Sequence, residues 1–182
     1  SSDLLQTSFG VNMLALDCGR PVLMSLRDIV AAFIAFREDV VTRRITYLLR
    51  KARERAHILV GLLIAVANID EIIALIRAAA DPATARIALM ARDWPAEAVA
   101  PLIALVEEDA VVTATYRLSE EQAKAILELR LQRLTGLERD KIGEELSGVA
   151  GEFRSHLEIL GSRERLLDVL REELRAIKEQ FS

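Results

Sequence analysis

The chain has 182 residues, of which 52% are apolar and 29% charged, and it contains only eight glycines and four prolines. This composition excludes an intrinsically disordered or fibrous chain, and the length excludes tandem large domains. The net charge of −4 leaves no overall excess of positive charge to hold phosphates, so any contact with nucleic acid must be local.

The cysteine count and the hydropathy pattern indicate the cellular compartment in which the protein is expected. Cys18 is the only cysteine, so an internal disulfide is excluded and a reducing compartment is expected. The longest apolar run, Ile58–Ile69, is shorter than the roughly 20 residues that a membrane span needs. Asp3 and Gln6 interrupt the apolar stretch at the start, which argues against a signal peptide. We therefore expect a cytoplasmic protein with no membrane partner.

A β-hairpin is predicted at the start of the chain. Over Phe9–Leu16, one set of every-second residues (Phe9, Val11, Met13 and Ala15) alternates with the other (Gly10, Asn12, Leu14 and Leu16), as in a strand. The pattern breaks at Asp17–Pro21, and a second apolar segment follows at Val22–Met24. A two-stranded ribbon alone is marginal in water, so we expect this hairpin to be the remnant of a larger domain.

A very long helix is expected next. Ser25 and Asp28 form an N-terminal capping signal, and no proline lies between Ile29 and Asp81 to stop the helix. From residue 41 the apolar positions are spaced by fours and threes, as in the seam of a coiled coil. This first seam consists of Val41, Ile45, Leu48, Ala52, Ala56, Leu59, Leu63 and Val66. A lone helix would expose it, so a partner helix is required.

The same spacing returns near the other end of the chain, which predicts an antiparallel helix pair. This second seam consists of Ile142, Leu146, Val149, Phe153, Leu157 and Leu160. Gly143, Gly148 and Gly151 fall within the return helix, where they mark either a hinge or close packing against the facing helix.

Shorter helices separate the two seams and form a small globular head. They are expected at about Asp70–Ala79, after Asp81–Pro82 and over Glu120–Leu134, with a proline-broken segment from Trp94 to Glu107. Two capping boxes delimit the helices around the return point, namely Ser119 with Gln122 and Thr135 with Glu138. A last helix runs to Phe181. The predicted fold is mainly α: a long antiparallel two-helix coiled coil carrying a small all-helical globular head, with a short N-terminal β-hairpin.

The residues offer no candidate active site, so no catalytic, cofactor-binding or metal-binding residue is assigned. His57 and His156 are the only histidines, and both are expected to be solvated residues on the polar flanks of the coil. Tyr47 and Tyr116 are the only phenols, and neither has the cluster of cations or the base that an activated nucleophile needs.

A basic stretch stands out against the acidic chain. Residues 37–55 carry a local charge of +4, which leaves −8 for the rest. The favoured interpretation is a solvated coil surface with intrahelical ion pairs, since no aromatic or glycine-rich loop accompanies the charge. The residues of a possible weak DNA contact are Arg43, Arg44, Arg50 and Lys51.

Five segments carry a resemblance to a known family. They are Gln6–Leu16 (QTSFGVNMLAL), Val40–Ile45 (VVTRRI), Leu49–Leu59 (LRKARERAHIL), Ala67–Ile73 (ANIDEII) and Leu118–Glu138 (LSEEQAKAILELRLQRLTGLE). Together they resemble the A subunit of the bacterial DNA gyrases, which are type IIA topoisomerases. The related topoisomerase IV subunit is similar in layout, but VVTRR and RKARERAHIL are closer to gyrase.

The resemblance implies a domain organisation. It assigns residues 1–27 to a remnant of the tower domain, 28–68 to the descending coiled-coil helix and 69–136 to the globular head that dimerises at the exit gate, or C-gate. Residues 137–161 would form the returning helix, and 162–182 a C-terminal helix that packs back toward the tower. The family's DNA-cleaving Arg-Tyr pair lies outside this chain, as do the ATPase and metal-binding parts, which belong to the B subunit. The chain would therefore not cleave DNA or need a cofactor by itself.

The resemblance also implies partners. The chain would be a homodimer through its heads, acting in the holoenzyme with double-stranded DNA and the gyrase B subunit during ATP-dependent negative supercoiling. The expected dimer residues are Ile126, Leu127, Leu129, Arg130, Leu131, Arg133 and Leu134, which give their helix more apolar positions than one amphipathic stripe needs. The alternative is that these leucines all face the core of their own head and form no interface. Arg130 matches a position linked to proteinaceous gyrase poisons.

Two other classes of function fit the sequence less well. A stand-alone coiled-coil homodimeric adaptor would explain the helix pair but not the hairpin or the long family-like segments. An enzyme acting in isolation would need a nucleophile or a metal cluster, for which the sequence offers no candidate.

Overall fold

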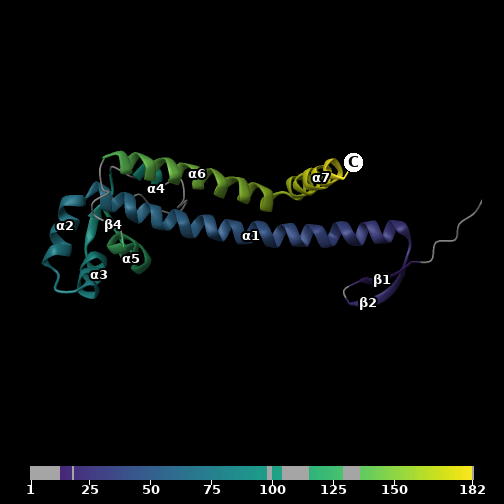
Figure 1. Cartoon of the computed structure of the whole chain (residues 1–182), viewed down its shortest axis with the longest axis horizontal. Coiled ribbons are helices and arrows are strands. Elements are labelled where there is room, and N and C mark those ends of the chain that lie inside the picture. Colours follow the sequence, from purple (N-terminus) through teal and green to yellow (C-terminus); the bar gives the residue numbers. More distant parts are fainter. Residues whose placement is uncertain (1–12, 18, 98–99, 104–114, 129–135, 182) are drawn as a thin grey trace, which may run out of the picture. The chain divides into compact units, whose positions relative to one another are not determined.

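The computed structural model describes residues 13–17, 19–97, 100–103, 115–128 and 136–181. The chain divides into two compact units, which are residues 1–45 with 162–182 and residues 46–161. Helix α1 (Leu26–Ala67) belongs to both (Figure 1). The predicted mainly helical class is confirmed, together with the long first helix and the N-terminal hairpin.

The hairpin of the first unit has a tight turn. Strand β1 (Met13–Asp17) pairs antiparallel with β2 (Arg20–Met24), with Met13 opposite Met24 and Asp17 opposite Arg20. Gly19 in the turn has a φ of 79°, the left-handed conformation that two-residue hairpin loops require and that glycine adopts without steric cost.

Helix α1 begins where its capping signal predicts. The backbone N–H of Ser25 donates to the Asp28 carboxylate at 3.1 Å, and the hydroxyl of Ser25 donates to the same carboxylate at 2.6 Å. These hydrogen bonds lower the pKa of the Asp28 carboxyl from its usual value. Asp28 also places a negative charge in the first turn, where the helix dipole favours it.

Helix α7 (Arg163–Gln180) is joined to the first part of α1 by ion pairs. It starts at Ser162, whose hydroxyl oxygen accepts from the backbone N–H of Arg165 at 3.4 Å. Glu173 of α7 binds both Arg37, at 2.7 Å, and Arg44 of α1. Among the described residues of this unit, the buried apolar ones are Val41, Ile45, Leu166 and Leu170.

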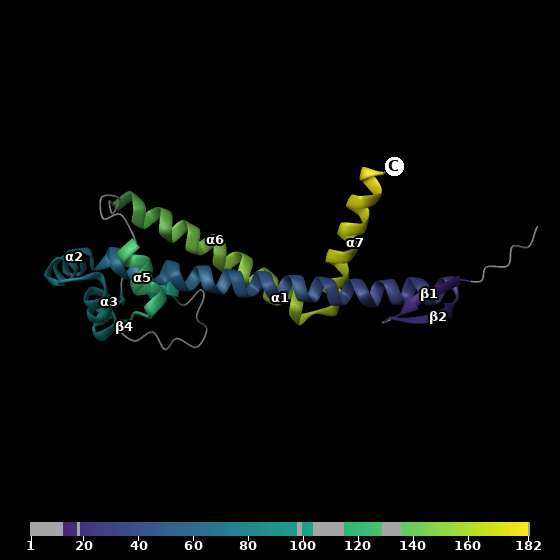
Figure 2. The same cartoon turned by 60° about the horizontal axis from the view of Figure 1, so that its bottom comes forward.

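The second unit holds the remaining elements between the end of α1 and α6. They are α2 (Ile69–Ala78), α3 (Pro82–Ala91), β3 (Asp93–Pro95), α4 (Ala100–Ile103), β4 (Thr115–Arg117), α5 (Glu120–Glu128) and α6 (Gly136–Gly161). Helix α6 runs antiparallel to the part of α1 in this unit in both views (Figures 1 and 2). The predicted helices around 70–79 and after Asp81 are therefore present, whereas residues 129–134 and the Thr135 capping box lie outside the described residues.

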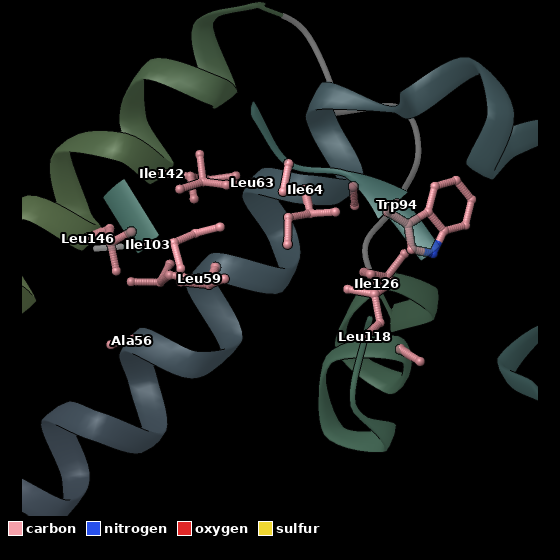
Figure 3. Close-up of a cluster of buried hydrophobic side chains, with 14 of the residues drawn as sticks. Ala56, Leu59, Leu63, Ile64, Trp94, Ile103, Leu118, Ile126, Ile142 and Leu146 are labelled. Atoms are coloured by element: carbon pink, nitrogen blue, oxygen red, sulfur yellow. The ribbon is translucent and has the colours of Figure 1, made fainter. Parts of the chain in front are cut away.

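The core of this unit is built around the last turns of α1. Figure 3 shows Leu63 and Ile64 of α1 between Ile142 of α6 on one side and Trp94 of β3 on the other. Ile103 of α4 joins the same cluster beside Leu59. Four elements, α1, α6, β3 and α4, thus contribute to the core in which the two seams meet.

The two predicted seams differ in burial along their length. Most residues of the first seam are buried, and Ile142 and Leu146 of the second seam are buried with them. Leu48 and Leu157, by contrast, are 38% and 37% exposed. Burial along the two seams is therefore uneven, and Leu48 and Leu157 are the more exposed positions.

A small sheet in the head departs from the all-helical prediction. Strands β3 and β4 pair antiparallel, with Trp94 opposite Tyr116. The indole N–H of Trp94 donates to the backbone carbonyl of Leu89 at 2.9 Å, and the guanidinium of Arg92 lies 4.8 Å from the centre of the ring system. Trp94 is fully buried and ties this sheet to α3.

The glycines of α6 do not interrupt the helix. Residues 136–161 form one continuous helix. A Cβ added at Gly148 or Gly151 would meet no other atom within 4 Å. Close packing against a facing helix therefore does not explain these two glycines.

None of the described helices, taken singly, has the length and apolar character needed to cross a membrane. Helices α1 and α2 meet that criterion only as a pair, and they are bent by 91° where they join.

Candidate functional site

The predicted dimer helix begins as α5, and the structure describes its first part. Ile126 is buried in the core of the head, and Leu127 is partly buried against that core. The other predicted dimer residues lie outside the described residues; they are Leu129, Arg130, Leu131, Arg133 and Leu134. The contacts that hold α5 in place therefore define the candidate site.

The capping box predicted at the start of α5 is present. The backbone N–H of Gln122 donates to the Ser119 hydroxyl at 3.3 Å, and the backbone N–H of Ser119 donates to Gln122 Oε1 at 2.9 Å. This reciprocal pair satisfies two backbone donors that a helix N-terminus would otherwise leave without partners.

The same glutamine also binds outside its own helix. Gln122 Nε2 donates to the backbone carbonyl of His57 in α1 at 2.8 Å and to the hydroxyl of Tyr116 in β4 at 3.1 Å. Its side chain is fully buried, and among the described residues it is the one polar residue in the buried class. Gln122 thus joins α5, α1 and β4 at a single buried amide.

Gly61 provides the space for this contact. A Cβ added at Gly61 would lie 2.7 Å from both Cβ and Cγ of Gln122, far inside ordinary van der Waals contact. Gly61 is one helical turn after His57, on the same face of α1. We call the contact of Gln122 with His57, Gly61 and Tyr116 the Gln122 joint.

The joint corrects the expectation that His57 is a solvated residue of the coil. His57 is partly buried, and its Nε2 lies 2.8 Å from the Ser119 hydroxyl. Sequence reasoning missed this contact because the two residues are separated by 62 positions. His156 is also not fully solvated, since its Nδ1 is buried and has no hydrogen-bond partner.

The Ser119 and His57 pair does not form an activated nucleophile. The Ser119 hydroxyl donates its proton to Glu121 Oε2 at 2.9 Å. The backbone N–H of Glu121 itself and then the Ser119 hydroxyl lower the pKa of that carboxyl, so it is ionised at neutral pH and can only accept. With its proton directed to a carboxylate, the hydroxyl accepts from His57 and serves as a helix cap rather than a reacting group.

Asn68 holds the corner at which the head leaves α1. Its side-chain amide donates to the carbonyl of Ile64 and to the carbonyl of Pro95, both at 2.9 Å. The first bond closes the end of α1, and the second ties β3 to the corner. A further ion pair between Arg86 of α3 and Glu120 links α3 to the start of α5.

The residues of the possible DNA contact are all paired with carboxylates. Arg43 pairs with Asp39, and Arg44 pairs with Glu173. Lys51 Nζ lies 2.9 Å from Glu54, and Arg50 Nε lies 3.9 Å from the same carboxylate. The pairs of Arg43, Arg50 and Lys51 lie within α1, like the intrahelical ion pairs expected from the sequence, whereas Arg44 pairs with a residue of α7. In the part of the chain that the structure describes, no group of three or more potential metal ligands lies together.

Comparison with known proteins gives the family. The sequence model for the A subunit of DNA gyrase/topoisomerase IV matches residues 2–175. The DNA gyrase A subunit of Granulibacter bethesdensis is 58% identical over 181 residues, which are 98% of this chain and 19% of that protein. Its counterpart in Rickettsia bellii is 56% identical over 98% of this chain and 20% of that protein. The counterpart in Salmonella typhimurium is 48% identical over 100% of this chain and 22% of that protein. The chain spans about a fifth of the length of these relatives. It belongs to the family formed by the A subunits of DNA gyrase and topoisomerase IV.

Proposed function

We propose that this chain is the coiled-coil arm and dimerisation head of the exit gate in the gyrase A subunit. Two heads meet, the arms enclose a cavity, and the transported DNA duplex leaves when the heads part. Membership of the family supports this, and the relatives named above are A subunits of DNA gyrase, which favours gyrase over topoisomerase IV.

The observation that carries the proposal is the anchoring of α5. Its N-terminal end is fixed to α1 and β4 through the Gln122 joint, and Ile126 anchors its middle in the head core. The sequence that follows, residues 129–134, consists of three leucines, two arginines and a glutamine. Leucine and arginine side chains in this combination are suited to an interface with an apolar centre, in which arginine is a frequent anchor.

In the holoenzyme the chain would act in the cytoplasm with double-stranded DNA and the gyrase B subunit. Cleavage of DNA and hydrolysis of ATP would take place in other parts of the assembly, and the head would contribute the gate. The surface around Arg130 would be the point at which proteinaceous gyrase poisons bind.

Light scattering over a dilution series of the chain tests the proposal. The unmodified chain is expected to be a dimer, and Leu131→Asp is expected to dissociate it, because a carboxylate at the centre of an apolar interface must be desolvated without a partner. Tyr47→Asp, at a half-exposed position of α1, is the matched control and should remain dimeric. A stable monomer of the unmodified chain at all concentrations would overturn the proposal.

A further inference from the structure

The side chain of Gln122 has more hydrogen bonds than a helix cap requires. A capping box needs one acceptor at this position, and Oε1 supplies it to the backbone N–H of Ser119. The two N–H groups of the amide are left over for other partners. They donate to the carbonyl of His57 and to the hydroxyl of Tyr116, so the buried amide is fully satisfied.

The partners of these two N–H groups belong to the surroundings of α5 and not to the helix itself. The carbonyl of His57 is part of the backbone of α1, which a side-chain rotation cannot move. Gly61 lets the stem of Gln122 approach that backbone, since a Cβ there would come within 2.7 Å of it. The position of α5 relative to the backbone of α1 therefore depends on one residue, Gln122.

We propose that Gln122 is a positioning residue for dimerisation, and that the Gln122 joint sets the orientation of α5 on the end of α1. This rests on the proposed function of α5 as the dimer helix. A rotation of α5 away from α1 must break the bond to the His57 carbonyl, and a rotation away from β4 must break the bond to the Tyr116 hydroxyl. Both bonds lie in a buried site, where a polar group without a partner is costly. The joint thereby transmits the orientation of the arm helix to the head.

Gln122→Glu separates the positioning role from the capping role. Glutamate serves a capping box as well as glutamine, so the bond from the Ser119 N–H is retained. A carboxylate has no proton to donate, so the bonds to the His57 carbonyl and the Tyr116 hydroxyl are lost. Tyr116→Phe is the milder second variant, because it removes one acceptor of the joint and leaves the cap intact.

Two controls accompany these variants. Glu128→Gln makes the reverse exchange of carboxylate and amide at an exposed position of the same helix. Ile142→Val weakens the core of the head on α6, away from the joint, so it reports what a general loss of stability does to dimerisation.

The measurements are amide hydrogen exchange of α5, the dimer dissociation constant from light scattering and the thermal midpoint. Gln122→Glu is expected to speed exchange in α5 and raise the dissociation constant by about tenfold or more, and Tyr116→Phe by a smaller factor. Glu128→Gln should change neither the exchange of α5 nor the dissociation constant. Ile142→Val should lower the thermal midpoint without raising the dissociation constant.

The outcomes distinguish this inference from the proposed function. If the unmodified chain is a dimer but Gln122→Glu and Tyr116→Phe both leave α5 exchange and the dissociation constant unchanged, the inference is wrong. It is also wrong if Ile142→Val weakens the dimer as much as Gln122→Glu does. If Gln122→Glu does not fold, Tyr116→Phe decides between the same outcomes. A monomeric unmodified chain would instead refute the proposed function, and the exchange of α5 would still show whether the joint fixes that helix.

Discussion

Gly61 of α1 lies directly against Gln122 of α5, so close that a Cβ on Gly61 would be 2.7 Å from Cβ and Cγ of the glutamine. Carbon atoms in favourable contact stay about 3.5–4 Å apart, so the two helices can approach this closely only because residue 61 has no side chain. Gly61 is buried within a continuous helix, and its requirement is for space rather than for an unusual backbone conformation.

Gly61→Ala is therefore expected to destabilise the head. The added methyl group must push α5 away from α1 or displace the backbone, and overpacking of this kind costs about 1–3 kcal/mol. Urea unfolding of the variant and of the unmodified chain measures the difference. A variant as stable as the unmodified chain would show that α5 can shift at no cost.

Gly148→Ala, by contrast, should stabilise the protein. The position is exposed, and a Cβ there would meet nothing within 4 Å, so the methyl group enters open space in the middle of α6. Replacing glycine by alanine in a helix interior stabilises by about 0.5–1 kcal/mol, because the unfolded chain loses conformational freedom. The same unfolding experiment checks this, and hydrogen exchange between residues 142 and 153 shows whether the glycines loosen the helix. A loss of stability in Gly148→Ala would contradict the open geometry.

The parts of the fold that the sequence predicts depend on neighbours in the chain. Ser25 and Asp28, Asp81 and Thr84, and Ser162 and Arg165 each form a helix cap across three residues. Such signals act locally, so they can be read without knowledge of the tertiary structure. The spacing of the apolar residues in α1 is informative for the same reason.

The parts that could not be predicted depend on partners far apart in the chain. The β3–β4 sheet pairs Trp94 with Tyr116, and the intervening sequence gives no turn signal that would join them. The Gln122 joint connects residues separated by 65 positions, and the periodicity of α1 makes Gly61 look like any other helical residue. Neither feature follows from local pattern, because each depends on how separate elements pack.

Glu173 is expected to hold α7 on α1 in the first unit. It binds both Arg37 and Arg44, and its side chain is only 27% exposed. Glu173→Gln removes the charge shared by two arginines, so we expect a loss of about 1 kcal/mol that shrinks at high salt. Glu172→Gln, the same change at the exposed neighbouring position, is the control. Equal effects of the two variants in unfolding experiments at low and high salt would show that the paired geometry contributes nothing.

Asp81 is expected to make the stability of the head depend on pH in the acid range. The backbone N–H of Thr84, and then its hydroxyl, bond to the Asp81 carboxylate and lower its pKa from the usual 3.8. A carboxyl whose pKa is lower in the folded state stabilises fully above its unfolded pKa, and this contribution is lost as the pH falls through the folded pKa.

Asp81→Asn separates the cap from its titration. Asparagine caps a helix about as well as aspartate but does not titrate, so the variant should lose less stability than the unmodified chain between pH 7 and about pH 2.5. Thermal unfolding across this range measures the effect, and Asp140→Asn makes the same exchange at an exposed position of α6. An unchanged acid-induced loss in Asp81→Asn would show that the cap is not the titrating group.

The basic stretch of α1 in the second unit contains a carboxylate beside two of its cations. Glu54 accepts from Lys51 at 2.9 Å, and this hydrogen bond lowers the pKa of the Glu54 carboxyl and raises that of the lysine. Arg50 lies 3.9 Å from the same carboxylate, so one acid offsets two neighbouring cations. Glu54→Gln should therefore strengthen the binding of double-stranded DNA to this surface, because the two cations become available to phosphates.

The salt dependence of DNA binding distinguishes this effect from a change in overall charge. If Arg50 and Lys51 gain phosphate contacts, the affinity of Glu54→Gln should fall more steeply with salt than that of the unmodified chain, by about 0.9 in the logarithmic slope for each added contact. Glu97→Gln changes the net charge equally at an exposed position of the head and should leave the slope unaltered. Equal slopes for the two variants would show that Arg50 and Lys51 gain no phosphate contact when the charge of Glu54 is removed.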